Sequence, residues 1–189
     1  RPFNLDEVKA ILEAFASDKS LTYYHDFVLF MFSLGVRPSE AIGLRWSAVD
    51  LDAGLVTISE AVIRLNSGGK AIRKGTKNGV VRTLKLTSRV TDMLGERREN
   101  QAEDDLVFPA PRGGYINNTA FLNRFWRKGC ERAGVPYRPL YTTRHTLISY
   151  GIEIEGWSLP QAAQVAGDTV GTIAHYYAHA IESPKMPDF

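Results

Sequence analysis

Two arginines close to apolar residues are the side chains of this sequence best suited to hold an anion. Arg37 lies in "GVRPSEAIGLRW", and Arg144 lies in "YTTRHTLISY". A guanidinium group in apolar surroundings is costly unless it is paired or holds an anion, and arginine binds phosphate through two parallel hydrogen bonds. The two arginines could therefore clamp a phosphate. Glu40, three residues after Arg37, could instead make the first arginine purely structural.

Two adjacent tyrosines near the end of the sequence are the candidate nucleophiles. Tyr176 and Tyr177 lie between His175 and His179 in "TIAHYYAHA". A phenol, with a pKa of about 10 in water, is a poor nucleophile until its proton is removed or its anion is stabilised, which nearby guanidinium groups can do. In the other interpretation both rings fill the core, since helical periodicity alone favours a core position for Tyr177.

A long stretch without acidic residues could face a polyanion. Between Arg64 and Thr91 the sequence has no Asp or Glu but many Lys and Arg residues. Such a block is typical of a nucleic-acid contact, and also of a solvated loop. Four of its residues, Arg73, Lys74, Arg82 and Lys85, are the ones we expect to contact the backbone of such a nucleic acid.

A second basic segment, "NRFWRKGCER", could add to the same surface. It carries Arg124, Arg127, Lys128 and Arg132. The alternative for this segment is a solvated helix face over a core stripe of Phe121 and Phe125.

The elements that would position these residues are mostly helices. "FNLDEVKAILEAF" predicts a helix that Asn4 and Glu7 begin with a capping box. "LTYYHDFVLFMFSLG" is apolar almost all round and predicts a central buried helix that ends at Gly35. Pro38 then fits the first turn of a short helix, with Arg37 at the connection.

A change of periodicity predicts a small sheet in the first half of the chain. Residues 55–58 form an apolar, β-branched run that favours a strand. "RKGTKNGVVRTLKL" predicts a hairpin that turns at Asn78 and Gly79, with Lys77 directly before the turn. Helical patterns then return up to the C-terminal region. The sequence therefore predicts a mostly α fold with a small antiparallel β-sheet, of the α+β class.

The composition fits one globular domain inside a cell. The chain has 189 residues, 44% of them hydrophobic, and a formal net charge of +2. It has no run of 18 apolar residues and no secretory signal. Cys130 is the single cysteine, which excludes a disulfide framework and a cysteine-based metal site. We expect an intracellular protein, and the start without Met suggests part of a longer one.

Four motifs in this order resemble the catalytic domain of the tyrosine recombinases, the phage integrase family. "GVRPSEAIGLRWSAVDL" resembles the segment with the first active-site arginine, and "TKNGVVRTLKL" resembles the β-hairpin that carries the family's lysine. "YTTRHTLISY" resembles the His-x-x-Arg motif, and "VAGDTVGTIAHYYAH" resembles the segment from Leu-Gly-His to the nucleophilic tyrosine. The resemblance covers the chain from Pro2 to about His179, and it implies the fold of the DNA breaking-rejoining enzymes.

The resemblance also implies a role for each matching residue. Arg37 and Arg144 would grip the scissile phosphate, with Glu40 as the acidic companion of the first arginine. Lys77 would protonate the leaving 5′ oxygen, and Tyr177 would be the nucleophile. Tyr176, by contrast, would be packing.

Two positions depart from the family pattern. Tyr141 replaces the histidine of His-x-x-Arg, and Asp168 replaces the histidine of Leu-Gly-His. In the family both positions lie beside the scissile phosphate. Tyrosine can still donate a hydrogen bond, whereas a charged aspartate should disfavour a nearby phosphate. His145 or His175 could compensate, but the sequence places neither of them.

The resemblance further implies the reaction and the partners. The activity would be site-specific recombination or integration of double-stranded DNA through a 3′-phosphotyrosine, with no ATP, cofactor or metal ion. Residues 1–180 would form the catalytic domain, and residues 181–189 a tail exchanged between protomers of a tetramer on DNA. The isolated fragment could be a monomer. An upstream DNA-clamping domain would lie outside this chain, and the protein would be cytoplasmic, at the nucleoid of a bacterium or phage host.

Three other interpretations remain open at this point. The departures at Tyr141 and Asp168 favour a catalytically weakened relative that binds DNA. A type IB topoisomerase-like enzyme would share the chemistry but relax DNA alone. A helical interaction module would have no role with nucleic acid.

Overall fold

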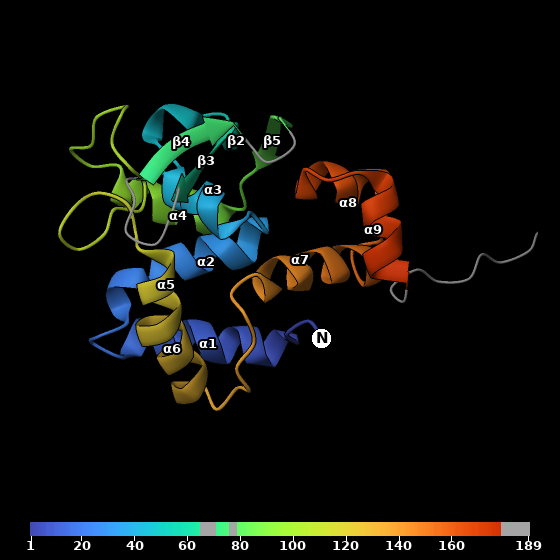
Figure 1. Ribbon diagram of the computed structural model, residues 1–189, viewed down its shortest axis with the longest axis horizontal. Helices are drawn as coiled ribbons and strands as arrows, with labels where there is room; N and C mark the ends of the chain where they lie inside the picture. Colours follow the sequence, from blue (N-terminus) through green and yellow to red (C-terminus); the bar gives the residue numbers. More distant parts are fainter. Residues whose placement is uncertain (65–70, 76–78, 179–189) are drawn as a thin grey trace, which may run out of the picture.

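Helices make up most of this protein, and two small antiparallel sheets lie to one side of them (Figure 1). The computed structural model describes residues 1–64, 71–75 and 79–178. The α-helices are α1 (Leu5–Ser17), α2 (His25–Leu34), α3 (Pro38–Gly43), α4 (Ser88–Arg97), α5 (Asn118–Phe121), α6 (Arg127–Arg132), α7 (Thr142–Glu153), α8 (Leu159–Ala166) and α9 (Val170–Tyr177). The strands are β1 (Val49–Asp50), β2 (Leu55–Ile58), β3 (Glu60–Arg64), β4 (Ala71–Gly75) and β5 (Arg82–Lys85). Shorter turns are the 3₁₀ segments Thr22–Tyr24 and Trp46–Ala48 and a π-helical turn, Leu122–Trp126. The prediction of a mostly α fold with a small antiparallel sheet is confirmed.

Helix α2 is the centre of the main core, as its sequence predicts. Seven of its ten residues are buried, because apolar side chains occupy every face. Gly35 ends the helix with φ 58°, a left-handed conformation that glycine adopts without a steric penalty. A Cβ at this position would lie 2.9 Å from the Leu147 side chain, so the glycine also allows α7 to approach closely.

Side-chain caps begin several of the helices around this core. Asn4 forms the predicted capping box with Glu7 at the start of α1. Ser158 and Thr169 cap α8 and α9 in the same chain region as the candidate tyrosines. The short connection between α8 and α9 is therefore fixed at both ends, by Gly167 at the end of α8 and by Thr169 at the start of α9.

The predicted hairpin around Asn78 and Gly79 is wrong. Strand β4 pairs with β3, and β5 pairs with β2, so the two arms of the supposed hairpin do not pair with each other. The register explains why. Gly75 lies opposite Glu60 and Arg82 lies opposite Ile58, so six residues, 76–81, connect β4 and β5 where one residue separates β2 and β3. Asn78, the first residue of the predicted turn, lies outside the described residues.

A second, smaller core joins α7, α8 and α9. It contains Ile148, Ala162, Ala163, Ala166, Ile173 and Tyr177. Alanines on α8 let the neighbouring helices pack closely around it. In Figure 1, α8 and α9 lie together beside α7, away from α1 and α6. This small core positions the C-terminal tyrosine.

The helices of the described part of the chain are short. The longest α-helix among them, α1, has 13 residues, whereas a bilayer span needs about 20 apolar residues. None of the described helices has the length and apolarity that crossing a membrane requires.

Candidate active site

A pocket of about 440 Å³ gathers most of the candidate residues from three parts of the chain. Its lining residues are Arg37, Tyr141, Arg144, His145, Asp168, Thr172, Ile173, Tyr176 and Tyr177. Five of the six predicted catalytic residues are among them. The sixth, Lys77, lies outside the described residues.

Arg37 reaches this pocket from the start of α3. Its Nη1 donates to Glu40 Oε1 at 3.1 Å, and Glu40 Oε2 accepts from the Arg37 backbone N–H at 2.8 Å. The same glutamate therefore caps the helix and holds the arginine side chain. Nη2 of Arg37 points the other way and donates to Asp168 Oδ2 at 3.1 Å. The companion role predicted for Glu40 as the ion-pair partner of Arg37 is seen in the geometry.

Arg144 is held by the carboxyl ends of two helices. Its Nη1 donates to the carbonyl of Gly35 at 3.0 Å, and its Nη2 donates to the carbonyl of Ala166. These carbonyls lie at the ends of α2 and α8, where unpaired carbonyls and the helix dipole favour a cation. The side chain is only 3% exposed, and its burial lowers the pKa of Arg144 from its usual value. Helix packing thus fixes this guanidinium with little freedom to move.

Asp168 bridges the two arginines. Its Oδ2 accepts from Nη2 of Arg37 and from Nη2 of Arg144, each at 3.1 Å. Gly167 ends α8 with φ 60°, which turns the chain so that the carboxylate faces both guanidinium groups. The sequence indicated that a carboxylate here opposes a phosphate. In the structure the carboxylate takes up the hydrogen-bond donors that an anion would need.

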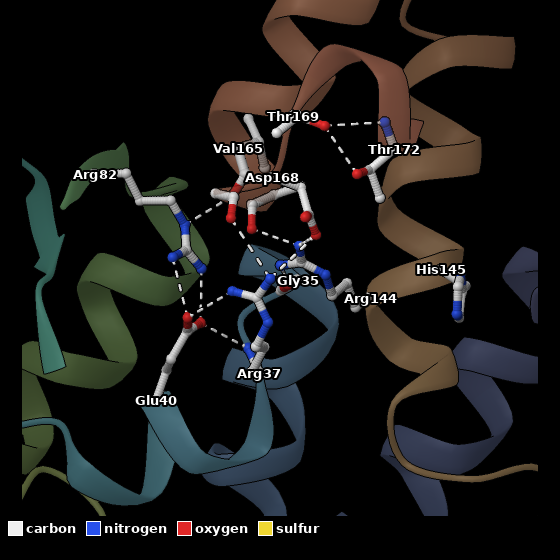
Figure 2. Close-up of polar contacts among 12 residues, drawn as sticks. Gly35, Arg37, Glu40, Arg82, Arg144, His145, Val165, Asp168, Thr169 and Thr172 are labelled. Atoms are coloured by element: carbon white, nitrogen blue, oxygen red, sulfur yellow. Dashed lines mark hydrogen bonds and ion pairs between the residues drawn. The ribbon is translucent and has the colours of Figure 1, made fainter. Parts of the chain in front are cut away.

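These side chains form one line of alternating charges, drawn in Figure 2. It runs from Arg82 through Glu40, Arg37 and Asp168 to Arg144. Each carboxylate lies between two arginines, so three positive charges face two negative ones. A net positive charge therefore remains in the pocket when Asp168 is in place.

Arg82 corrects a prediction, because it is buried and cannot lie on a DNA-facing surface. It donates to both carboxylate oxygens of Glu40, at 3.1 and 2.7 Å, and to the carbonyl of Val165 at 3.0 Å. The alternation of strand β5 turns Arg82 and Leu84 inward. That period-two pattern, with Arg82 in phase with a leucine, was the sequence signal for burial.

Tyr177 is a buried residue whose hydroxyl faces a histidine. Its side chain belongs to the small core, yet its Oη lies 2.8 Å from Nδ1 of His145. Burial raises the pKa of Tyr177 to about 12, although nearby Arg144 opposes this shift. Tyr176, in contrast, is 61% exposed, so the prediction that Tyr176 is packing is wrong. Both tyrosines line the pocket, but only the Tyr177 ring is buried in the small core.

Two further rings complete the pocket beside the tyrosine. His145 lies between Tyr177 and Tyr141, with ring centroids 5.7 and 5.2 Å away. Tyr141 is 39% exposed, at the start of α7, and the Arg144 guanidinium lies 6.0 Å above its ring. His175 is exposed and contacts Tyr176. Of the two histidines left open by the sequence, the structure therefore brings His145 to Tyr177, a contact that no sequence pattern predicted.

Some of the remaining basic residues are exposed, and others are paired with acidic or aromatic side chains. Lys74 and Lys85 are exposed on β4 and β5, whereas Arg73 is hydrogen-bonded to Glu60. On the second basic segment, Lys128 and Arg132 pair with Asp18, and Arg127 stacks on Tyr137. These contacts give much of that segment a structural role.

Across residues 1–64, 71–75 and 79–178, no three His, Cys, Asp or Glu side chains are placed to hold an ion together. The pocket is instead lined by guanidinium and phenol groups, which are donors toward an oxyanion.

A match in sequence shows the family to which the chain with this pocket belongs. Residues 2–183 match the family described as the phage integrase family. The chain belongs to the phage integrase family. Among curated relatives of this family member, a tyrosine recombinase XerC-like protein of Caldanaerobacter subterraneus is 27% identical over 97% of this chain and 51% of its own length. Tyrosine recombinase XerC of Xanthomonas campestris is 28% identical over 78% of this chain and 41% of its own length. The chain spans about half the length of the curated relatives it matches.

Solved structures support the same fold for this phage integrase family chain. The Tn1549 transposon integrase in complex with circular intermediate DNA matches with a TM-score of 0.83 at 16% identity, over 95% of this chain and 63% of that one. The catalytic domain of bacteriophage HP1 integrase matches with a TM-score of 0.62 at 20% identity, over 95% of this chain and 88% of that one. The predicted fold of a tyrosine recombinase catalytic domain is confirmed.

The position of Asp168 leads to a direct prediction about anion binding. Replacing Asp168 by asparagine removes the charge that competes for Arg37 and Arg144, so the pocket should bind inorganic sulfate more tightly by about tenfold, equal to about 1.4 kcal/mol. Sulfate titrations at low ionic strength, followed by calorimetry and by the rise in Tm, would measure the change. Asp18→Asn is the matched control, because Asp18 pairs with Lys128 and Arg132 outside the pocket. Equal sulfate affinity in the two variants would contradict the prediction.

Proposed function

We propose that this chain is the catalytic domain of a site-specific tyrosine recombinase or integrase that cleaves and rejoins double-stranded DNA. The observation that carries the proposal is the joint placement of Arg37, Arg144 and Tyr177 around one pocket in a chain of the phage integrase family. A phenol beside two fixed guanidinium groups suits attack on a phosphodiester, because the charge that develops on phosphate is met by donors already in place.

Each residue has a role in the proposed cleavage step. The Tyr177 oxygen attacks phosphorus, the bond from phosphorus to the 5′ oxygen breaks, and the product is a 3′-phosphotyrosine. Arg37 and Arg144 bind the non-bridging oxygens, and Tyr141, which lines the same pocket, donates a further hydrogen bond. Lys77 gives a proton to the leaving 5′ oxygen.

The covalent intermediate explains how the strand is rejoined. The energy of the phosphodiester bond is kept in the phosphotyrosine, so a 5′ hydroxyl from another strand can displace Tyr177 without ATP. In the proposal the arginines serve both steps, since the same charge develops in each direction. Neither step calls for a metal ion or a cofactor.

The proposed partner is double-stranded DNA, and the proposed assembly is a tetramer on it. The Tn1549 integrase structure holds circular intermediate DNA, which supports a DNA partner for this chain. Lys74 and Lys85 are exposed and suited to contact the DNA backbone, and Arg73 can join them if it leaves Glu60. The exchange of residues 181–189 between protomers stays a prediction, because this tail lies outside the described residues. An enzyme with this partner would act at the nucleoid in the cytoplasm.

One observation favours a second candidate function, a weakened relative that binds DNA without cleaving it. Asp168 takes donors from both arginines, so a phosphate must displace this carboxylate or share the donors with it. If the displacement costs more than the phosphate regains, the chain would hold DNA by its basic surface and form no covalent bond.

A covalent capture experiment separates the two functions. The chain is incubated with a pool of nicked duplexes of random sequence, in which a cut near the nick releases a short strand that cannot rejoin. Adducts that survive SDS are digested, and mass spectrometry identifies the modified residue. An adduct on a tyrosine of the pocket supports the recombinase. DNA binding without an adduct supports the weakened relative. The absence of both DNA binding and an adduct would contradict both functions.

A further inference from the structure

The hydroxyl of Tyr177 has a nitrogen base in direct contact. His145 Nδ1 lies 2.8 Å from Tyr177 Oη, and the two side chains come from α7 and α9. We propose that His145 is a catalytic residue that takes the proton from Tyr177 as its oxygen attacks phosphorus. This inference rests on the proposed function and gives a defined role to His145, which the sequence left open beside His175.

The tyrosine needs a base because its surroundings oppose ionisation. Its pKa of about 12 leaves about one phenol in 10⁵ ionised at pH 7. Arg144 favours the phenolate, but burial, Tyr141 and Asp168 act against it. A base that accepts the proton during the attack removes the need for a free phenolate beforehand.

His145 is suited to accept a proton in this position. The groups that face it are Tyr177 from α9 and Tyr141 and Arg144 on its own helix. Burial lowers the pKa of His145, and the charge of Arg144 acts in the same direction, so the imidazole is neutral at pH 7. With its proton on Nε2, a neutral imidazole accepts the Tyr177 O–H at Nδ1.

Other bases near the pocket are less well placed. The bonded oxygen of Asp168 already accepts from both arginines, at 3.1 Å each. His175 is exposed and lies against Tyr176. Figure 2 draws His145 apart from the line of arginines and carboxylates. The division of tasks is therefore spatial, with anion binding on one side of Arg144 and proton transfer on the other.

The step balances in both directions. On cleavage the proton moves from Tyr177 Oη to His145 Nδ1, the new oxygen–phosphorus bond forms, and the 5′ oxygen leaves with a proton from Lys77. On rejoining, a 5′ hydroxyl gives its proton back to Lys77 and its oxygen bonds to phosphorus, while the His145 imidazolium returns its proton to the Tyr177 oxygen as that oxygen leaves. No oxidant, metal or further reactant is required.

The test compares the pH dependence of adduct formation in three variants on the same pool of nicked duplexes. His145→Gln keeps a hydrogen bond to Tyr177 but cannot take a proton, so its adduct should form about 10²-fold more slowly at pH 7. Its rate should rise tenfold per pH unit up to pH 9, while the wild-type rate levels off above the pKa of His145. His145→Ala should behave similarly and regain part of its rate with added imidazole. His175→Ala should match the wild type in rate and profile.

Each outcome decides the proposal. If the wild type forms the adduct and His145→Gln shows the same pH profile, His145 is not the base, but the recombinase proposal stands. An adduct rate in His145→Gln equal to or faster than the wild-type rate would have the same meaning. The absence of any wild-type adduct would overturn the recombinase, and the role of His145 with it. Thermal unfolding of each variant shows whether it is folded. If His145→Ala does not fold, the pH profile of His145→Gln alone decides.

Discussion

Replacing Tyr177 by phenylalanine should abolish the covalent adduct with DNA, whereas the same change at Tyr176 should leave the rate within about threefold of the wild type. The phenol oxygen of Tyr177 is the atom that would bond to phosphorus, and the phenylalanine side chain has no oxygen to take its place. Tyr176 is 61% exposed at the neighbouring position of α9 and contacts His175 rather than His145. The measurement is the fraction of DNA that stays attached to protein in SDS after incubation with the nicked duplexes.

The two tyrosine variants control for each other. Phenylalanine keeps the Tyr177 ring in the small core and loses one hydrogen bond to His145, which costs about 1 kcal/mol of folding stability. The Tyr177→Phe protein should therefore still fold and still bind DNA through its basic surface. Loss of the adduct in Tyr176→Phe, with an intact adduct in Tyr177→Phe, would reverse the assignment of the nucleophile. An adduct that survives in both variants would exclude α9 as its source.

Features set by local sequence were predictable before the structure. The capping box at Asn4, the buried helix α2 and its end at Gly35 each depend on residues within a few positions of one another. The two arginines of the pocket were also singled out, because a charge beside apolar neighbours is unusual. Their placement near helix ends follows from the same local pattern.

Features set by pairing across the chain were not predictable in the same way. The Asn-Gly turn signal is local. The pairing of β4 with β3 and of β5 with β2 instead depends on strands that are distant in sequence. Burial of Arg82 could have been inferred from its phase with Leu84. Its pairing with Glu40, 42 residues away in sequence, could not have been inferred from the local pattern.

The chemistry of the pocket depends most on such distant contacts. Asp168 meets Arg37 across 131 positions of sequence, and His145 meets Tyr177 across 32. The resemblance to the recombinases singled out Asp168 as an obstacle to phosphate. It could not show that the carboxylate bonds to both arginines, since that requires α3, α7 and the α8–α9 connection to be placed in space.

Glu40 is the residue whose loss should destabilise the fold most strongly among the charged groups of the site. Its side chain is 1% exposed and accepts hydrogen bonds from both Arg82 and Arg37. Glu40→Gln leaves Arg82, 3% exposed, without a charged partner, and breaking a buried pair in this way costs about 3–5 kcal/mol. Arg37 would lose its anchor as well, so adduct formation should fall together with the free energy of unfolding.

Urea denaturation measures this effect, with Glu60→Gln as the matched control. Glu60 also pairs with an arginine, Arg73, but both side chains are more than 40% exposed, so its loss should cost about 0–1 kcal/mol. A loss in Glu40→Gln no larger than that in Glu60→Gln would contradict a supporting role for the buried carboxylate.

The pH dependence of the unfolding free energy is a second, independent measurement of the effect of Glu40→Gln. Burial alone would raise the pKa of Glu40, but hydrogen bonds and attraction from Arg82, with help from Arg37, outweigh it and hold the pKa below the usual 4.5. A carboxyl group with a lowered pKa in the folded state contributes stability above its unfolded pKa and loses that contribution as the pH falls toward the folded value. The gap in unfolding free energy between wild type and Glu40→Gln should therefore be constant from pH 7 to about 5 and shrink below pH 4.5, by up to about 1.4 kcal/mol per pH unit. A gap that stays constant down to pH 3.5 would mean that the charge of Glu40 does not stabilise the fold, and that its effect comes from shape and hydrogen bonding alone.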